Sequence, residues 1–132
     1  MTMKPAREAI DVGIVVGDIG ASLGFYQGLL GLARIEEFDV PFGRVHRLKF
    51  GNSFIKLIEP TDRTKLGPLG ICASLGFRYL TFPVCNIDEV CEKAALAGAA
   101  FDMEKQELMP GVMVAMVRDP DGNVVELVER RR

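Results

Sequence analysis

The sequence predicts an α+β fold in which one βαβββ module occurs twice. DVGIVVGD at residues 11–18 is similar to YLTFPVCN at residues 79–86, and SFIKLIE at residues 53–59 is similar to NVVELVE at residues 123–129. The two offsets, 68 and 70 residues, nearly agree, which indicates a duplicated unit. We expect a single domain composed of module one at about 8–60, a connector at about 61–76 and module two at about 77–130.

The elements of the first module follow from apolar patterning and from the residues that interrupt it. A β-branched, apolar run over residues 9–16 predicts a strand. Asp18 can then cap a helix that continues to about Leu30, where Gly31 ends it. Strands are expected near residues 33–39, 44–50 and 53–59, with Gly51 and Asn52 as the turn of the last hairpin.

The second module repeats this order. A strand at residues 77–84 leads to Asn86, which has Glu89 three residues later, the spacing of a capping box, and the helix stops at Gly98. Strands follow near residues 100–105, 112–118 and 123–129, with DPDGN as the last turn. The connector, rich in Gly and Pro, is either a functional cover over a site or a plain linker.

Length and charge exclude several classes of protein. A chain of 132 residues fits one domain and can bury about two-thirds of the surface that its unfolded form exposes. Its 16 Lys and Arg residues are mixed with 18 Asp and Glu residues, which leaves no basic face for a nucleic acid. Apolar runs stay shorter than the about 18 residues of a membrane span, and the N-terminal residues carry charges instead of an apolar signal core. We therefore expect a soluble, cytoplasmic protein that binds neither nucleic acid nor membranes.

Residue types that often serve in metal or redox sites have a simpler interpretation here. Cys72, Cys85 and Cys91 are odd in number and lack CxxC spacing, so we expect small, buried apolar side chains rather than disulfides or a zinc site. The only histidine, His46, falls on the helix side of its strand, where a packing role is more common than catalysis.

Alternation along the strands predicts which side chains share a face. If Gly51 and Asn52 form a two-residue loop, Lys56 lies opposite Arg47, and Phe54 lies opposite Lys49. The helix side is then apolar, with Leu48, Phe50, Ile55 and Leu57 from this hairpin, Ile10, Val12, Ile14 and Val16 from the first strand, and Val125 and Leu127 from the last. The opposite, concave side carries Asp11, Gly13, Val15, Val124, Glu126 and Val128 as well. An apolar core beneath a face with ionisable groups is typical of a ligand-binding sheet.

The segments LGFYQGLLGL and DPDGNVVELVE, together with the doubled βαβββ order, resemble the vicinal oxygen chelate superfamily. This superfamily includes glyoxalase I, methylmalonyl-CoA epimerase, extradiol dioxygenases and bleomycin-resistance proteins. The resemblance covers nearly the whole chain and implies a curved mixed sheet around a cavity. It also implies a homodimer and, in metal-dependent members, a divalent ion held by His, Glu or Gln from the first and last strands of each module.

The metal ligands implied by the resemblance are mostly replaced in this chain. Asp11 stands at the first histidine position, Lys56 at a glutamate position and Tyr79 at the second histidine position, whereas Glu126 matches. Protonated lysine has no lone pair and neutral tyrosine is a poor ligand. We therefore expect no metal cofactor, with Lys56 near the place of the lost ion. If any ion binds, Asp11 and Glu126 are its candidate ligands.

Several interpretations of these four residues remain open. They form a structural ion cluster, a metal-free acid–base site, or part of a non-catalytic binding protein of the bleomycin-resistance type. A metal-dependent enzyme with altered ligands is a further alternative. We favour a lyase or isomerase acting on a small anionic or carbonyl-bearing metabolite, with Asp11, Lys56, Tyr79 and Glu126 as catalytic candidates. Arg47, Phe54 and Met116 are the expected substrate-binding residues.

Overall fold

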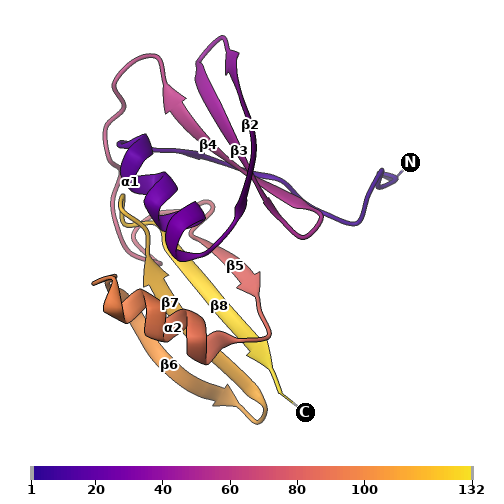
Figure 1. The fold of residues 1–132 in the computed structure, drawn as a ribbon, viewed down its shortest axis with the longest axis vertical. Coiled ribbons are helices and arrows are strands. Elements are labelled where there is room, and N and C mark those ends of the chain that lie inside the picture. Colours follow the sequence, from indigo (N-terminus) through magenta and orange to yellow (C-terminus); the bar gives the residue numbers. More distant parts are fainter. Residues whose placement is uncertain (1, 132) are drawn as a thin grey trace. The chain divides into compact units, whose positions relative to one another are not determined.

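The computed structural model describes residues 2–131 and confirms the α+β fold with two βαβββ units (Figure 1). The chain divides into two compact units, one up to Lys65 and one from Leu66 onwards, and the boundary lies inside the predicted connector. Whether both belong to one domain stays a prediction. Within these residues, no helix is both long enough and apolar enough to cross a membrane.

The first unit forms a four-stranded sheet in the order β1-β4-β3-β2, in which only β1 and β4 are parallel. Its elements are β1 (Val12–Val15), α1 (Ile19–Leu23), η1 (Gly24–Leu29), β2 (Ala33–Val40), β3 (Gly43–Phe50) and β4 (Ser53–Pro60). The second unit has the equivalent order β5-β8-β7-β6, with β5 and β8 parallel. It contains β5 (Tyr79–Pro83), α2 (Ile87–Leu96), β6 (Phe101–Met109), β7 (Val112–Arg118) and β8 (Val124–Arg130).

The predicted first helix is present, but its second half is wider than an α-helix. The Asp18 side chain caps α1 by accepting from the Ala21 N–H at 3.1 Å. The helix then widens into η1, a π-helical turn in which the Leu30 N–H donates to the Phe25 carbonyl five residues back. Gly31 ends the segment with φ +80°, a backbone conformation that glycine adopts without steric cost.

The predicted register of the β3–β4 hairpin is confirmed. Arg47 pairs with Lys56 and Lys49 pairs with Phe54, while Leu57 and its apolar neighbours on the other face are buried. Helix α1 packs against β4, and α2 packs against β7 and β8 (Figure 1). The apolar side of each sheet therefore forms the core beneath a helix, as the alternation of residues predicts.

Several local predictions are wrong or incomplete. Ile10 is 80 % exposed rather than packed, because β1 begins only at Val12, where its pairing with β4 starts. Cys91 is buried as expected, but Cys72 and Cys85 are exposed because neither lies in a helix or strand. His46 is buried in the first unit, with Glu37 3.2 Å from its Nδ1 and Glu59 3.4 Å from its Nε2, in keeping with a packing role.

The predicted capping box of α2 is not formed. The Asn86 side chain accepts no bond from the helix N-terminus and instead donates to the Glu89 carboxylate at 3.0 Å. The Ile87 N–H donates to Oε1 of Glu129, on β8, at 2.7 Å. This bond and the neighbouring Arg131 hold the pKa of Glu129 below its usual range.

Candidate functional site

The face of the first sheet that is turned away from α1 carries two cations side by side. Arg47 on β3 and Lys56 on β4 are register partners. The Arg47 guanidinium lies 3.6 Å from the centre of the Phe54 ring, and its Nη1 is 2.6 Å from Oε1 of Glu36. Arg7 approaches the same ring at 5.0 Å. Three predicted site residues, Arg47, Phe54 and Lys56, are therefore neighbours on one surface.

Asp11 lies at the edge of this surface, but its carboxylate is already engaged. Oδ2 accepts from the Arg7 guanidinium, and Oδ1 accepts from the Phe54 backbone N–H at 2.9 Å. The bond from Arg7 is the main cause that holds the pKa of Asp11 below its usual value, and the charge of Lys56 contributes in the same direction. A carboxylate of lowered pKa is a weak proton acceptor near neutral pH, which favours an electrostatic role for Asp11 over a role as general base.

The second sheet places Glu126 at the centre of the equivalent face. Glu126 on β8 pairs with Thr81 on β5 and with Met116 on β7. The Thr81 hydroxyl donates to Oε1 of Glu126 at 2.8 Å. Tyr79 pairs with Val124, two residues before Glu126, and is 53 % exposed. Tyr79, Glu126 and Met116 are therefore brought to one face of the second sheet.

In both units, the candidate residue at the first strand lies beside the position two residues before the candidate residue on the last strand. This shared geometry supports the equivalence of the four positions. Since Val12 pairs with Ile55, Asp11 lies beside Phe54, two residues before Lys56 on β4. Tyr79 stands in the same relation to Glu126. The structure thus brings Asp11 together with Lys56 in the first unit, and Tyr79 together with Glu126 in the second.

Two polar side chains at these faces were not predicted from the sequence. Thr81 could have been found, because it lies two residues after Tyr79 and therefore on the same face of its strand. Arg7 had no such signal, since it precedes the first strand and reaches Asp11 and the turn residue Asn52 only in the folded chain.

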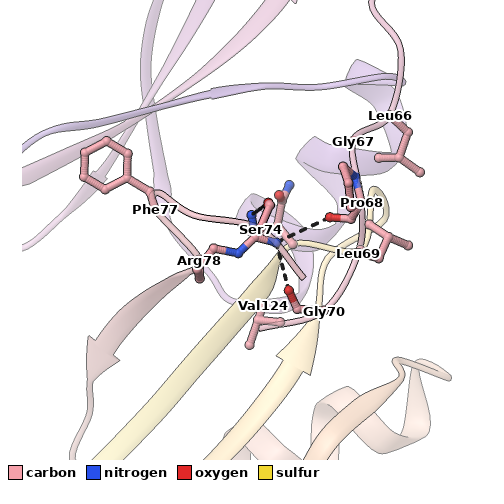
Figure 2. A pocket seen from close by; sticks show the side chains of 11 residues that line it. Leu66, Gly67, Pro68, Leu69, Gly70, Ser74, Phe77, Arg78 and Val124 are labelled. Atoms are coloured by element: carbon pink, nitrogen blue, oxygen red, sulfur yellow. Dashed lines mark hydrogen bonds between the residues drawn. The ribbon is translucent and has the colours of Figure 1, made fainter. Parts of the chain in front are cut away.

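A cavity of about 220 Å³ lies in the second unit, where the connector approaches the start of β8 (Figure 2). Its lining comes from the connector, from Arg78 at the entrance to β5, and from Gly122, Asn123 and Val124. Figure 2 shows the Arg78 guanidinium turned toward the carbonyl groups of Pro68 and Gly70, whereas the Phe77 ring extends away from it. Val124 and Val128, which the alternation of residues places on the concave side, are buried.

The residues at the four family ligand positions do not fit a divalent ion. In the first unit, Lys56 offers an ammonium group, and both oxygens of Asp11 already accept hydrogen bonds. In the second unit, Tyr79 offers a phenol, and Glu126 alone matches the usual ligand chemistry. Among residues 2–131, no three His, Cys, Asp or Glu side chains are arranged to hold an ion.

Comparisons with known proteins agree with the fold. The family described as the Glyoxalase/Bleomycin resistance protein/Dioxygenase superfamily matches residues 10–127. A probable lactoylglutathione lyase of Synechocystis sp. is 30 % identical over 88 % of this chain and 90 % of its own. A lactoylglutathione lyase of Neisseria meningitidis is 29 % identical over 88 % and 86 %.

Solved structures show the same architecture. A glyoxylase/bleomycin resistance protein/dioxygenase domain from Frankia sp. EAN1pec has a TM-score of 0.80 at 23 % identity, over 100 % of this chain and 95 % of that one. The trypanothione-dependent glyoxalase I of Leishmania major has a TM-score of 0.75 at 23 % identity, over 94 % and 87 %. The chain belongs to the Glyoxalase/Bleomycin resistance protein/Dioxygenase superfamily.

Proposed function

We propose that this protein is a metal-independent lyase or isomerase that acts on a small metabolite carrying a carboxylate or a carbonyl group. The observation that carries the proposal is the Arg47–Lys56 pair. Like charges directly opposite each other on neighbouring strands destabilise a sheet, so such a pair needs a compensating anion. Glu36 compensates the charge of Arg47, whereas none of the ion pairs among the described residues of the first unit includes Lys56.

The roles that we assign follow from the environment of each side chain. Glu126 is the general base, because both oxygens of Asp11 already accept hydrogen bonds and the bond from Arg7 lowers the pKa of the Asp11 carboxyl. Lys56 and Arg47 stabilise negative charge on a substrate oxygen. Tyr79, with its half-exposed phenol, donates a hydrogen bond or a proton.

The chemistry is proton transfer at a carbon next to a carbonyl. Glu126 takes the proton, the electrons of the C–H bond form a carbon–carbon double bond, and the π electrons of the carbonyl move to its oxygen, where the cations stabilise the enolate. Return of the proton to another atom gives an isomer, and loss of a leaving group from the enolate gives a lyase product. The lactoylglutathione lyases named above are relatives of this chain, but the residues at its ligand positions favour a reaction without a metal.

A non-catalytic binding protein is the second candidate. The Phe54 ring beneath the Arg47 guanidinium favours it, since such a stacked pair can hold an aromatic anion without any chemistry. Both candidates keep the family expectation of a homodimer and the expectation of a cytoplasmic location. Sedimentation and cell fractionation test these two expectations.

The Lys56→Met variant tests the catalytic proposal, and Lys49→Met is its matched control. Lys49 is an exposed lysine on the same hairpin, opposite Phe54. The assay is incorporation of deuterium from D2O at the methyl carbon of pyruvate, with lactoylglutathione as a second probe. We expect Lys56→Met to lose about a hundredfold or more in rate, as when other charge stabilisers are removed, and Lys49→Met to retain the rate.

Two results would contradict the proposal. Equal rates in the two variants would remove Lys56 from the catalytic role, and a natural chain that exchanges no faster than buffer would leave the binding protein as the better interpretation. Elemental analysis that finds about one transition-metal ion per purified chain, lost together with activity in a Glu126→Gln variant, would show a metal-dependent enzyme with altered ligands.

A further inference from the structure

The connector is organised around one cation, Arg78, which immediately precedes β5. Its Nη2 donates to the carbonyl oxygens of Gly70 at 2.8 Å and of Pro68 at 3.4 Å, and its Nε donates to the carbonyl of Ile71 at 3.2 Å. Its Nη1 donates to the Ser74 hydroxyl at 2.7 Å. Within the described chain, Arg78 is thus surrounded by three carbonyl groups and a hydroxyl, and no carboxylate pairs with it.

Among the acceptors of residues 2–131, none takes two of the hydrogen-bond donors at this point, which remain available to a ligand. A guanidinium carries five N–H groups, and the four bonds leave one on Nη1. Ser74 accepts from Nη1, so the hydrogen of its own hydroxyl is free to donate. Both atoms belong to residues that line the 220 Å³ cavity. The two unused donors are therefore adjacent, and the positive charge of Arg78 strengthens the hydrogen bonds that they form with an anion.

The cavity has the size and lining for a small charged group. Gly67, Gly70 and Gly122 line it without side chains that could fill it, and Arg78 is the one charged residue among the described residues of its lining. Pockets that hold a whole ligand usually have volumes of at least about 300 Å³. This cavity is smaller, so it suits one end of a molecule. Charge-assisted hydrogen bonds are roughly twice as strong as neutral ones, so a carboxylate gains more here than an amide or a hydroxyl does.

We propose that this cavity is a carboxylate-binding subsite in which Arg78 Nη1 and Ser74 Oγ donate to the carboxylate of the ligand. Val124 lines the cavity, pairs with Tyr79 and lies two residues before Glu126 on β8. A ligand anchored here can extend along the face that carries both of those residues. The identification of that ligand as the substrate rests on the proposed function, whereas the binding itself does not.

The test is an NMR titration of the full chain with pyruvate and with its neutral analogue pyruvamide. We expect pyruvate to shift the amide signals of Gly70, Ser74 and Gly122, and pyruvamide to bind at least tenfold more weakly. The Ser74→Ala variant should bind pyruvate about tenfold more weakly, because it loses one bond to a charged group. Leu75→Ala is the matched control, since Leu75 is fully exposed on the same connector and does not line the cavity.

A second variant, Arg78→Lys, keeps the charge but has three donors, too few to hold both the connector and a ligand. It should bind pyruvate more weakly than Ser74→Ala does. Equal affinities for pyruvate and pyruvamide, equal affinities in Ser74→Ala and Leu75→Ala, or shifts confined to the β3–β4 hairpin would overturn the inference. Pyruvate binding that depends on Ser74 without any deuterium exchange would leave the subsite in place and contradict the proposed function instead.

Discussion

Replacing Gly122 by alanine tests whether the connector is docked on the turn before β8. Gly122 has φ +86°, a conformation that side chains disfavour, and a Cβ added there would lie 2.9 Å from Cδ2 of Leu69 on the connector. Gly98, at the end of α2, has φ +77°, but an added Cβ would meet no atom within 4 Å. Gly98→Ala is therefore a control in the same unit that carries the backbone strain alone.

The expected cost can be worked out from two contributions. A left-handed backbone conformation costs a residue with a side chain about 1–2 kcal/mol. Replacing glycine also reduces the conformational entropy of the unfolded chain, which stabilises the folded state by about 0.4–1 kcal/mol. Gly98→Ala should therefore lower the free energy of unfolding by roughly 1 kcal/mol. In Gly122→Ala, Leu69 must also swing away, since its contact is too short. Full burial of a leucine side chain contributes about 1.5–3 kcal/mol to stability. Since Leu69 is 45 % exposed, losing its buried half adds roughly 1 kcal/mol to the cost of the substitution.

Urea unfolding of the two variants, each with and without Leu69→Ala, measures these contributions. We expect Gly122→Ala to cost about twice as much free energy of unfolding as Gly98→Ala, and the excess to vanish when Leu69 is alanine. Hydrogen exchange of the connector amides should accelerate in Gly122→Ala only. An equal cost for both glycines, or an excess that persists without the Leu69 side chain, would refute the docking of the connector through Leu69.

Three further predictions concern the core, the acid range and the metal site. Leu57→Ala, at a fully buried position of β4, should lower the free energy of unfolding by about 2–5 kcal/mol in urea, and a loss below about 1 kcal/mol would show that its core is loosely packed. Because Arg7 lowers the pKa of Asp11, this carboxylate adds stability above its unfolded pKa of about 3.9, and the contribution disappears as pH falls through the lower folded pKa. Arg7→Gln should raise that pKa in an NMR titration, and an unchanged value would contradict the assigned cause. Lys56→Glu combined with Tyr79→His should bind Ni²⁺ or Zn²⁺ more tightly than the natural chain in calorimetry, and equal affinities would show that Asp11 has also lost its use as a ligand.

Local patterns in the sequence predicted the order of the elements and most of their faces. Alternation of apolar residues, glycines at turns and the Asp18 cap act over a few residues, so they appear directly in the order of the chain. The two-residue turn sets the register of β3 and β4, so the position of Arg47 opposite Lys56 follows from residue numbers alone. The repeat likewise identified the equivalent positions in the two units.

Only the tertiary structure decided which partners the polar side chains take. Glu129 caps α2 from a strand 42 residues away, Arg7 engages Asp11 and the distant turn residue Asn52, and Arg78 gathers the carbonyl groups of an irregular loop. No periodic pattern encodes such bonds, because a side chain's choice among acceptors depends on where remote backbone segments pass in the folded chain. Residue types and strand parity therefore predicted the chemistry available on each face, whereas the path of the connector decided that Arg78, with no sequence motif of its own, lines a cavity.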